Sequence, residues 1–209
     1  MAEMTPMMQQ YLKTKEQYKD CILFYRLGDF YEMFFDDALT ASKVLEITLT
    51  GRDCGQPERA PMCGVPYHAC DVYLNKLIEN GFKVAICEQV EDPKLAKGIV
   101  KREVIRVVTP GTNMSNAILD ETRNNYLMSI FENDGAFGIS LVDITTGEFK
   151  TARVPSLSKL TDEINKYSPA EIIGNHSFMN CDLDFVYLRE KMKISISEAP
   201  EHYLNQMLC

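Results

Sequence analysis

A tight turn between two apolar runs is the feature that most constrains how this chain can fold. Residues 21–27 form a dense apolar and aromatic run that is typical of a strand. Gly28 and Asp29 follow, and a two-residue loop with glycine first is the signal of a type II′ hairpin. The aromatic run of residues 30–34 then forms the return strand. The sequence therefore predicts an antiparallel hairpin over residues 21–34.

The return strand places an aromatic ring and a carboxylate close to the tip of this hairpin. Phe30 and Glu32 are two positions apart, so their side chains face the same side of the strand, about 7 Å apart. Either Phe30 and Glu32 project together from a stiff hairpin, or Phe30, Phe34 and Phe35 all belong to the core and Glu32 is a solvated neighbour. Burial is the commoner fate of a phenylalanine, and the residues alone leave both interpretations open.

Helical and strand patterns alternate through the first half, which indicates an α/β domain. The predicted helices cover residues 6–19, beginning at Thr5-Pro6, then 36–46 and 67–80, and the predicted strands beyond the hairpin cover 47–50, 82–89 and 104–109. Residues 51–66 hold three glycines and three prolines and are predicted to form a long loop. Turn formers begin at Pro110, so the domain is predicted to occupy residues 1–112.

The remaining residues, 113–209, are predicted to form a second domain. Three strands are expected in an antiparallel meander, followed by a helix and an added strand, over residues 126–131, 137–144, 148–154, 157–167 and 171–174. That order of elements is typical of a ribonuclease-H-like fold. Residues 201–209 read as the start of a helix that the end of the chain cuts, so this domain is expected to be truncated at its carboxyl end.

The charge of the chain is awkward for a free-standing DNA binder. The net charge is −8, and residues 1–112 carry 14 Lys and Arg against 16 Asp and Glu, while residues 113–209 carry 8 against 14. A local basic run, at Lys94, Lys97, Lys101, Arg102 and Arg106, is more often a solvated face than a binding site. Neither part of the chain has the strongly basic balance of a free-standing nucleic-acid binder.

Composition also bounds the compartment and the metal chemistry. No apolar run approaches the roughly 18 residues needed to span a bilayer, and the amino terminus lacks a signal core, so a cytoplasmic protein is expected. Seven scattered cysteines are expected to be free thiols in a reducing cytosol. Soft ligands gather at Cys54, Cys63, His68 and Cys70, but their spacing is not that of a zinc finger, and no metal site is predicted.

Five motifs in order give the chain a likeness to a known family. They are TPMMQQYL at 5–12, FYRLGDFYEMFFDDA at 24–38, PMCGVPYHA at 61–69, VAICEQ at 84–89 and RVVTPGT at 106–112. Together they resemble the amino-terminal region of the MutS family of bacterial DNA mismatch-repair proteins, closely over residues 4–112 and more weakly beyond. The resemblance implies an α/β, mixed-sheet mismatch-recognition domain followed by part of a ribonuclease-H-like connector domain.

The resemblance also implies roles for individual residues. Phe30 would be an aromatic wedge that enters mismatched duplex DNA from the minor groove, and Glu32 would be its companion. A mismatch weakens pairing and stacking, so insertion there costs less than in intact duplex. Glu32 would repel the phosphates of correct duplex and hydrogen-bond the displaced base at a mismatch. Further candidates for contact with DNA are Asp29, Arg52, Pro61, Met62 and Arg102.

The catalytic residues that the resemblance implies are not found in this sequence. There is no Gly-x-x-x-x-Gly-Lys-Ser/Thr motif, so the chain is expected to be a binding module without catalytic residues and without a cofactor of its own. ATP and magnesium are expected in an absent ATPase domain, a homodimer in the full-length protein, and a repair partner on the connector domain. The alternative is a metal-dependent nuclease that uses Glu32 with Asp36 and Asp37, or Asp143.

Overall fold

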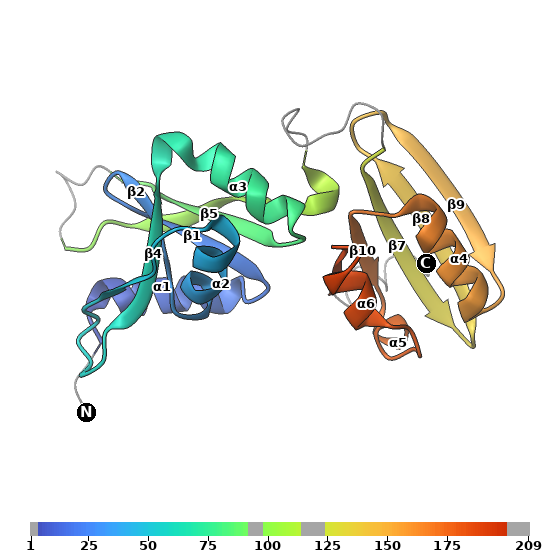
Figure 1. Ribbon diagram of the computed structural model, residues 1–209, viewed down its shortest axis with the longest axis horizontal. Helices are drawn as coiled ribbons and strands as arrows, with labels where there is room; N and C mark the ends of the chain where they lie inside the picture. Colours follow the sequence, from blue (N-terminus) through green and yellow to red (C-terminus); the bar gives the residue numbers. More distant parts are fainter. Residues whose placement is uncertain (1–3, 92–97, 114–123, 200–209) are drawn as a thin grey trace. The chain divides into compact units, whose positions relative to one another are not determined.

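The computed structural model describes residues 4–91, 98–113 and 124–199 of the chain. They form two compact units, residues 1–108 and 109–209, each with its own β-sheet and helices (Figure 1). The division falls between Val108 and Thr109, four residues before the predicted boundary. Within the described ranges, no helix is long and apolar enough to cross a membrane. The α/β fold class predicted from the sequence is confirmed for both units.

The first unit contains a six-stranded mixed sheet in the order β3-β4-β2-β1-β5-β6. Its strands are β1 (Cys21–Leu27), β2 (Phe30–Phe34), β3 (Thr50–Arg52), β4 (Ala60–Pro66), β5 (Lys83–Gln89) and β6 (Arg102–Val108). Its helices are α1 (Pro6–Gln17), α2 (Phe35–Leu45), the short 3₁₀ helix η1 (Tyr67–Ala69) and α3 (Cys70–Glu79). The pairing of β1 with β5 is parallel, whereas the other pairings are antiparallel. The predicted hairpin of β1 and β2 is confirmed.

The segment predicted as a strand and a loop, residues 47–66, is where the prediction was wrong. Glu46 ends α2 in a left-handed conformation (φ 58°), and the Ile47 N–H donates to the Ser42 carbonyl, so the helix end occupies the backbone where a strand was expected. The strand β3 begins only at Thr50. Residues 60–66 form β4, which lies between β3 and β2 despite its two prolines. Cys63, expected in a loop, is buried in that strand.

The two faces of the first sheet are covered differently. On one face, the Tyr11 ring of α1 packs edge-on against Tyr25 and Phe34, with centroids 5.3 and 4.9 Å apart. On the other face α2 packs against β4, where the Cys63 thiol donates to the Ala38 carbonyl at 3.6 Å. Side chains alternate along a strand, so the face that α1 covers also carries Phe30 and Glu32. Along β2, both residues lie nearer the hairpin tip than Phe34 does.

The second unit contains a five-stranded sheet in the order β11-β10-β7-β8-β9. Its strands are β7 (Tyr126–Asn133), β8 (Ala136–Asp143), β9 (Glu148–Val154), β10 (Glu171–Gly174) and β11 (Ser195–Glu198). Its helices are η2 (Pro110–Thr112), α4 (Leu157–Tyr167), α5 (His176–Met179) and α6 (Phe185–Glu190). The predicted meander, helix and added strand are present. The helices α5 and α6 and the strand β11 were not predicted, and residues 201–209 lie outside the described residues.

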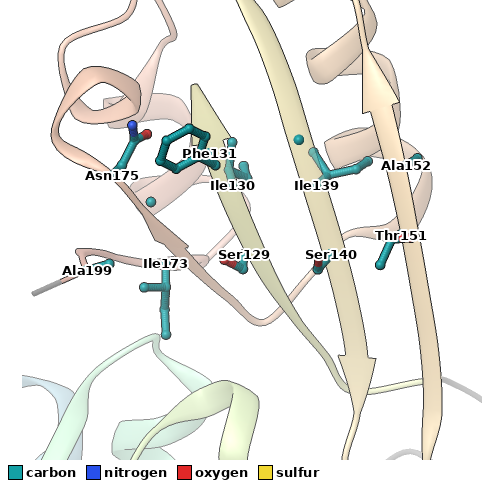
Figure 2. Close-up of a pocket in the computed structure, with 12 residues that line it drawn as sticks. Ser129, Ile130, Phe131, Ile139, Ser140, Thr151, Ala152, Ile173, Asn175 and Ala199 are labelled. Carbon is teal, nitrogen blue, oxygen red and sulfur yellow. The ribbon is translucent and has the colours of Figure 1, made fainter. Parts of the chain in front are cut away.

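The strands of the second sheet bury one set of alternate side chains and expose part of the other. Met128, Ile139 and Ile172 belong to the buried core, together with Leu160 and Ile164 of α4. The sheet also carries a pocket of about 390 Å³, shown in Figure 2, whose lining includes the core residues Ile130 and Ile139. Its lining combines apolar side chains with hydroxyl groups and contains no carboxylate; it consists of Ser129, Ile130, Phe131, Gly138, Ile139, Ser140, Thr151, Ala152, Ile173, Gly174, Asn175 and Ala199.

Candidate functional site

The turn that joins β1 to β2 is fixed from two directions. Leu27 pairs with Phe30 across the turn, and Gly28 has a φ of +58°, which a residue with a side chain rarely adopts. The Tyr67 N–H donates to the Asp29 carbonyl at 3.0 Å, and the Arg26 guanidinium donates to the Gly28 carbonyl. The same guanidinium lies 3.7 Å from the centroid of the Tyr67 ring. These contacts hold the hairpin tip in place without using the ring of Phe30.

Phe30 is the first residue of β2, and 46% of its surface is exposed. Phe34, on the same face of the same strand, is 1% exposed because α1 covers it. The interpretation of Phe30 as a core residue is therefore wrong, whereas that interpretation holds for Phe34. A half-exposed phenylalanine at the end of a braced strand is available to stack on a flat ligand.

Glu32 is paired with a cation from a strand that is not its neighbour. The Arg52 Nη1 of β3 donates to the Glu32 Oε2, and this ion pair spans β4, which lies between the two strands. The Glu32 side chain is 14% exposed and the Arg52 side chain is 37% exposed. Beside the pair lies an open hollow of about 550 Å³, lined by Phe30, Glu32, Glu46, Ile47, Thr48, Thr50, Met62 and Gly64. The exposed ring of Phe30 and the ion-paired carboxylate of Glu32 thus border the same open space.

The other predicted contact residues are placed unevenly around this hollow. Met62 lines it, and Asp29 lies in the turn next to Phe30. Pro61 pairs with Gly51 and is adjacent to Met62 in β4, but it does not line the hollow. Arg102 donates to the Arg26 carbonyl and to the Gln10 side chain, which leaves its guanidinium engaged within the unit. Contact of these residues with DNA stays a prediction.

Gly64 was not selected from the sequence, yet it shapes the site. It lies directly opposite Glu32 in the pairing of β2 with β4. A Cβ added at Gly64 would lie 3.3 Å from the Tyr31 carbonyl and 3.4 Å from the Glu32 Cγ, so the position has little room for a side chain. A glycine inside a strand marks such a close approach, but the signal is hidden because Pro61 and Pro66 make the segment resemble a loop.

The carboxylates of the nuclease alternative do not converge. Asp37 is buried, accepts from the Leu23 N–H at 3.0 Å and pairs with Lys15 at 2.9 Å, which is a structural role. Asp36 is exposed on the first turn of α2, and Glu32 is paired with Arg52. Within the described ranges no group of three or more His, Cys, Asp or Glu residues is placed to hold a metal ion. The described cysteines are free, and burial raises the pKa of Cys63 to about 11, which keeps this thiol protonated.

Asp143 is likewise occupied by its own turn. Its carboxylate accepts four hydrogen bonds, from the N–H groups of Asn125, Thr145 and Thr146 and from the Thr145 hydroxyl, over 2.6 to 3.4 Å. Burial opposes ionisation, but these bonds outweigh it, and the pKa of Asp143 lies below its usual value. The residue therefore stabilises the turn between β8 and β9 as an ionised acceptor.

Fold and site together define a class. The chain is a two-unit α/β protein whose first unit presents an aromatic ring and an ion-paired carboxylate from a braced hairpin. Two family models match it, MutS domain I over residues 5–117 and MutS domain II over residues 125–205. The chain belongs to the MutS family, and it covers these two domains.

Individual relatives are similar over nearly the whole chain. The DNA mismatch repair protein MutS of Lachnoclostridium phytofermentans is 66% identical over 203 residues, which are 97% of this chain and 22% of the relative. The protein of the same name from Acetivibrio thermocellus is 58% identical over 209 residues, which are 99% of this chain and 24% of the relative. The chain thus spans about a quarter of the length of these relatives.

Proposed function

We propose that the first unit recognises mismatched or unpaired bases in duplex DNA by inserting the Phe30 ring between base steps from the minor groove. The observation that carries this proposal is the 46% exposure of Phe30 on a hairpin that other residues hold in place. Membership in a family whose named relatives are DNA mismatch repair proteins supports the choice of ligand. The second unit would act as the connector to further parts of a repair protein.

The energetics of insertion favour damaged pairing over intact duplex. Unstacking a base step costs a few kcal/mol, and stacking a base on an aromatic ring returns about 1 to 3 kcal/mol. In intact duplex the two terms nearly cancel. At a mismatch the step is already weakened, so the same ring binds with a net gain. Such a wedge reads deformability and not base identity, as a general mismatch sensor requires.

The surroundings of the ring fit this role. The Glu32 carboxylate lies on the same face of β2 as Phe30 and borders the same hollow, where a displaced base would find a hydrogen-bonding group beside the ring. Asp29, Pro61, Met62 and Arg102 are candidates for contact with the sugar-phosphate backbone or the groove. ATP, magnesium, a second subunit and a repair partner would be bound through the full-length protein.

The test is a fluorescence-anisotropy titration of a duplex containing one G·T mismatch against its perfect counterpart, at low salt and without metal. Because the chain is acidic, the assay uses the full-length protein that contains it as well as the chain itself. Phe30→Ala is expected to remove the mismatch preference by weakening the mismatched complex about 5- to 150-fold, the equivalent of 1 to 3 kcal/mol.

A matched control is Phe149→Ala, which removes an exposed phenylalanine from β9 of the second unit, 66% exposed. This variant is expected to keep the preference. A mismatch preference that survives Phe30→Ala in the full-length protein would refute the wedge. Magnesium-dependent cleavage that Glu32→Ala abolishes would support the nuclease alternative instead.

A further inference from the structure

The ion pair of Glu32 and Arg52 is an arrangement that neither strand forms alone. β4 separates the two strands, and Gly64 on β4 leaves the surface beside Glu32 without a side chain. The Arg52 guanidinium reaches across β4 and donates to the Glu32 carboxylate. Glu32 is the more buried partner, with 14% of its side chain exposed against 37% for Arg52. The orientation of the carboxylate beside Phe30 is therefore tied to Arg52.

We propose, on the basis of the proposed function, that Arg52 is a positioning residue for Glu32 and thereby determines mismatch discrimination. Its guanidinium holds the carboxylate in a fixed place next to the wedge and neutralises its charge. This differs from the role predicted from the sequence, in which Arg52 is a contact to the DNA backbone. A phosphate contact strengthens binding to every duplex, whereas a positioning residue changes the ratio between duplexes.

Loss of Arg52 and loss of Glu32 should affect mismatch discrimination in different ways. Without Arg52, the Glu32 carboxylate stays largely buried but loses its cation, so it is free to reorient and repels nearby phosphates. Its hydrogen bond to a displaced base loses its fixed geometry, and the mismatched complex loses more affinity than the perfect complex. Without Glu32, Arg52 has nothing to orient. The effect of Arg52 on discrimination should therefore depend on the presence of Glu32.

A double-mutant cycle in the full-length protein tests this dependence. The ratio of the Kd for perfect duplex to the Kd for G·T duplex is measured for the wild type, Arg52→Met, Glu32→Ala and the double variant. We expect Arg52→Met to lower this ratio about tenfold, the loss expected for a charge-assisted hydrogen bond. In the Glu32→Ala background, where Arg52 has no side-chain acceptor at position 32, the same substitution should leave the ratio unchanged. Arg52→Lys, which retains the charge, should restore part of the ratio.

The control is Arg59→Met, since Arg59 is an exposed arginine just before β4 that forms no ion pair with Glu32. It removes the same charge, so it should weaken both duplexes equally and keep the ratio. If Arg52→Met behaves like Arg59→Met, with an unchanged ratio and a salt slope reduced by about 1, Arg52 is a phosphate contact and the inference is overturned.

Phe30→Ala in the same assay separates this inference from the proposed function. If Phe30→Ala keeps the mismatch preference, the wedge itself fails, and the role of Arg52 fails with it. If Phe30→Ala loses the preference while Arg52→Met keeps it, only the positioning role is refuted. Circular dichroism confirms that each variant is folded, and the ratio of two affinities cancels any common loss of active protein.

Discussion

Two hairpins of this chain carry a carboxylate close to a turn, and they use it in opposite ways. In the first unit, Glu32 lies on the return strand, pairs with Arg52 from another strand and borders an open hollow. In the second unit, Asp143 precedes the turn, is fully buried and accepts four hydrogen bonds from its own surroundings. Only the first arrangement leaves a carboxylate next to space that a ligand can enter.

The difference shows that an acid on a hairpin does not by itself indicate a site. Asp143 is surrounded by donors within or beside its own turn, so its chemistry is complete without a ligand. Glu32 has a single ion-pair partner, and the exposed ring of Phe30 lies two residues away. What distinguishes them is the number of donors that the fold supplies to each carboxylate.

The largest expected difference between the two carboxylates is in what their removal does to stability. Asp143→Ala leaves three backbone N–H groups without their acceptor, and we expect a loss of about 3 kcal/mol in the free energy of unfolding of the second unit. Glu32→Ala should cost the first unit less than about 1 kcal/mol, because its ion pair is partly exposed. Hydrogen exchange of the amides in β8 and β2 reports the two units separately.

Thr145→Val serves as a partial control for the same turn, since it removes the 2.6 Å hydroxyl bond to Asp143 and keeps the backbone bonds. It should cost less than Asp143→Ala. Equal protection of β8 in Asp143→Ala and in the wild type would show that the carboxylate does not stabilise this turn.

Acid should destabilise the second unit through protonation of Asp143. The folded-state pKa of Asp143 is lowered, so the stabilisation is fully present above the unfolded pKa of about 3.9 and is lost as the pH falls through the folded pKa. The free energy of unfolding of the second unit is thus expected to decrease below about pH 4. Urea unfolding at pH 7 and at lower pH measures it. The decrease should be smaller in Asp143→Asn, and an identical pH dependence would contradict the assignment.

The smallest effects are expected at the glycines of the two turns. Gly28 and Gly147 have φ values of +58° and +74°, with open space around both Cβ positions, so alanine at either is strained without a clash. Each substitution should cost about 1 kcal/mol of stability. Gly28→Ala should also lower the mismatch preference, because it redirects the tip that presents Phe30, whereas Gly147→Ala should not. Thermal unfolding measures the stability loss, and the anisotropy assay measures the mismatch preference. An equal effect of both variants on DNA binding would contradict the special role of Gly28.

Local sequence was sufficient for most elements of the fold. The hairpin of residues 21–34, the helices α1, α2 and α4 and the meander of the second unit follow from periodicity and turn residues, and they are present. β4 was not predicted, because Pro61, Gly64 and Pro66 oppose strand formation locally. It forms because it pairs with β2 over five residues and buries Cys63 and Val65, which is a gain that no local pattern encodes.

The site, too, was only partly predictable from local sequence. Phe30 and Glu32 were found together because two positions on one strand always share a face. The pairing of Glu32 with Arg52 joins residues 20 positions apart, across a strand whose place in the sheet was unknown. The short helices α5 and α6, with six residues or fewer, are too brief for a periodic signal.

By itself, the sequence determined the class of fold, the hairpin and the presence of a ring and a carboxylate at its tip, because turn chemistry and side-chain alternation act over a few residues. The tertiary structure decided which ring is exposed, since α1 covers Phe34 and not Phe30, and which cation meets Glu32. It also decided that Asp143 is enclosed by donors while Glu32 borders open space. Exposure and pairing depend on segments far apart in the chain, and only packing brings those segments together.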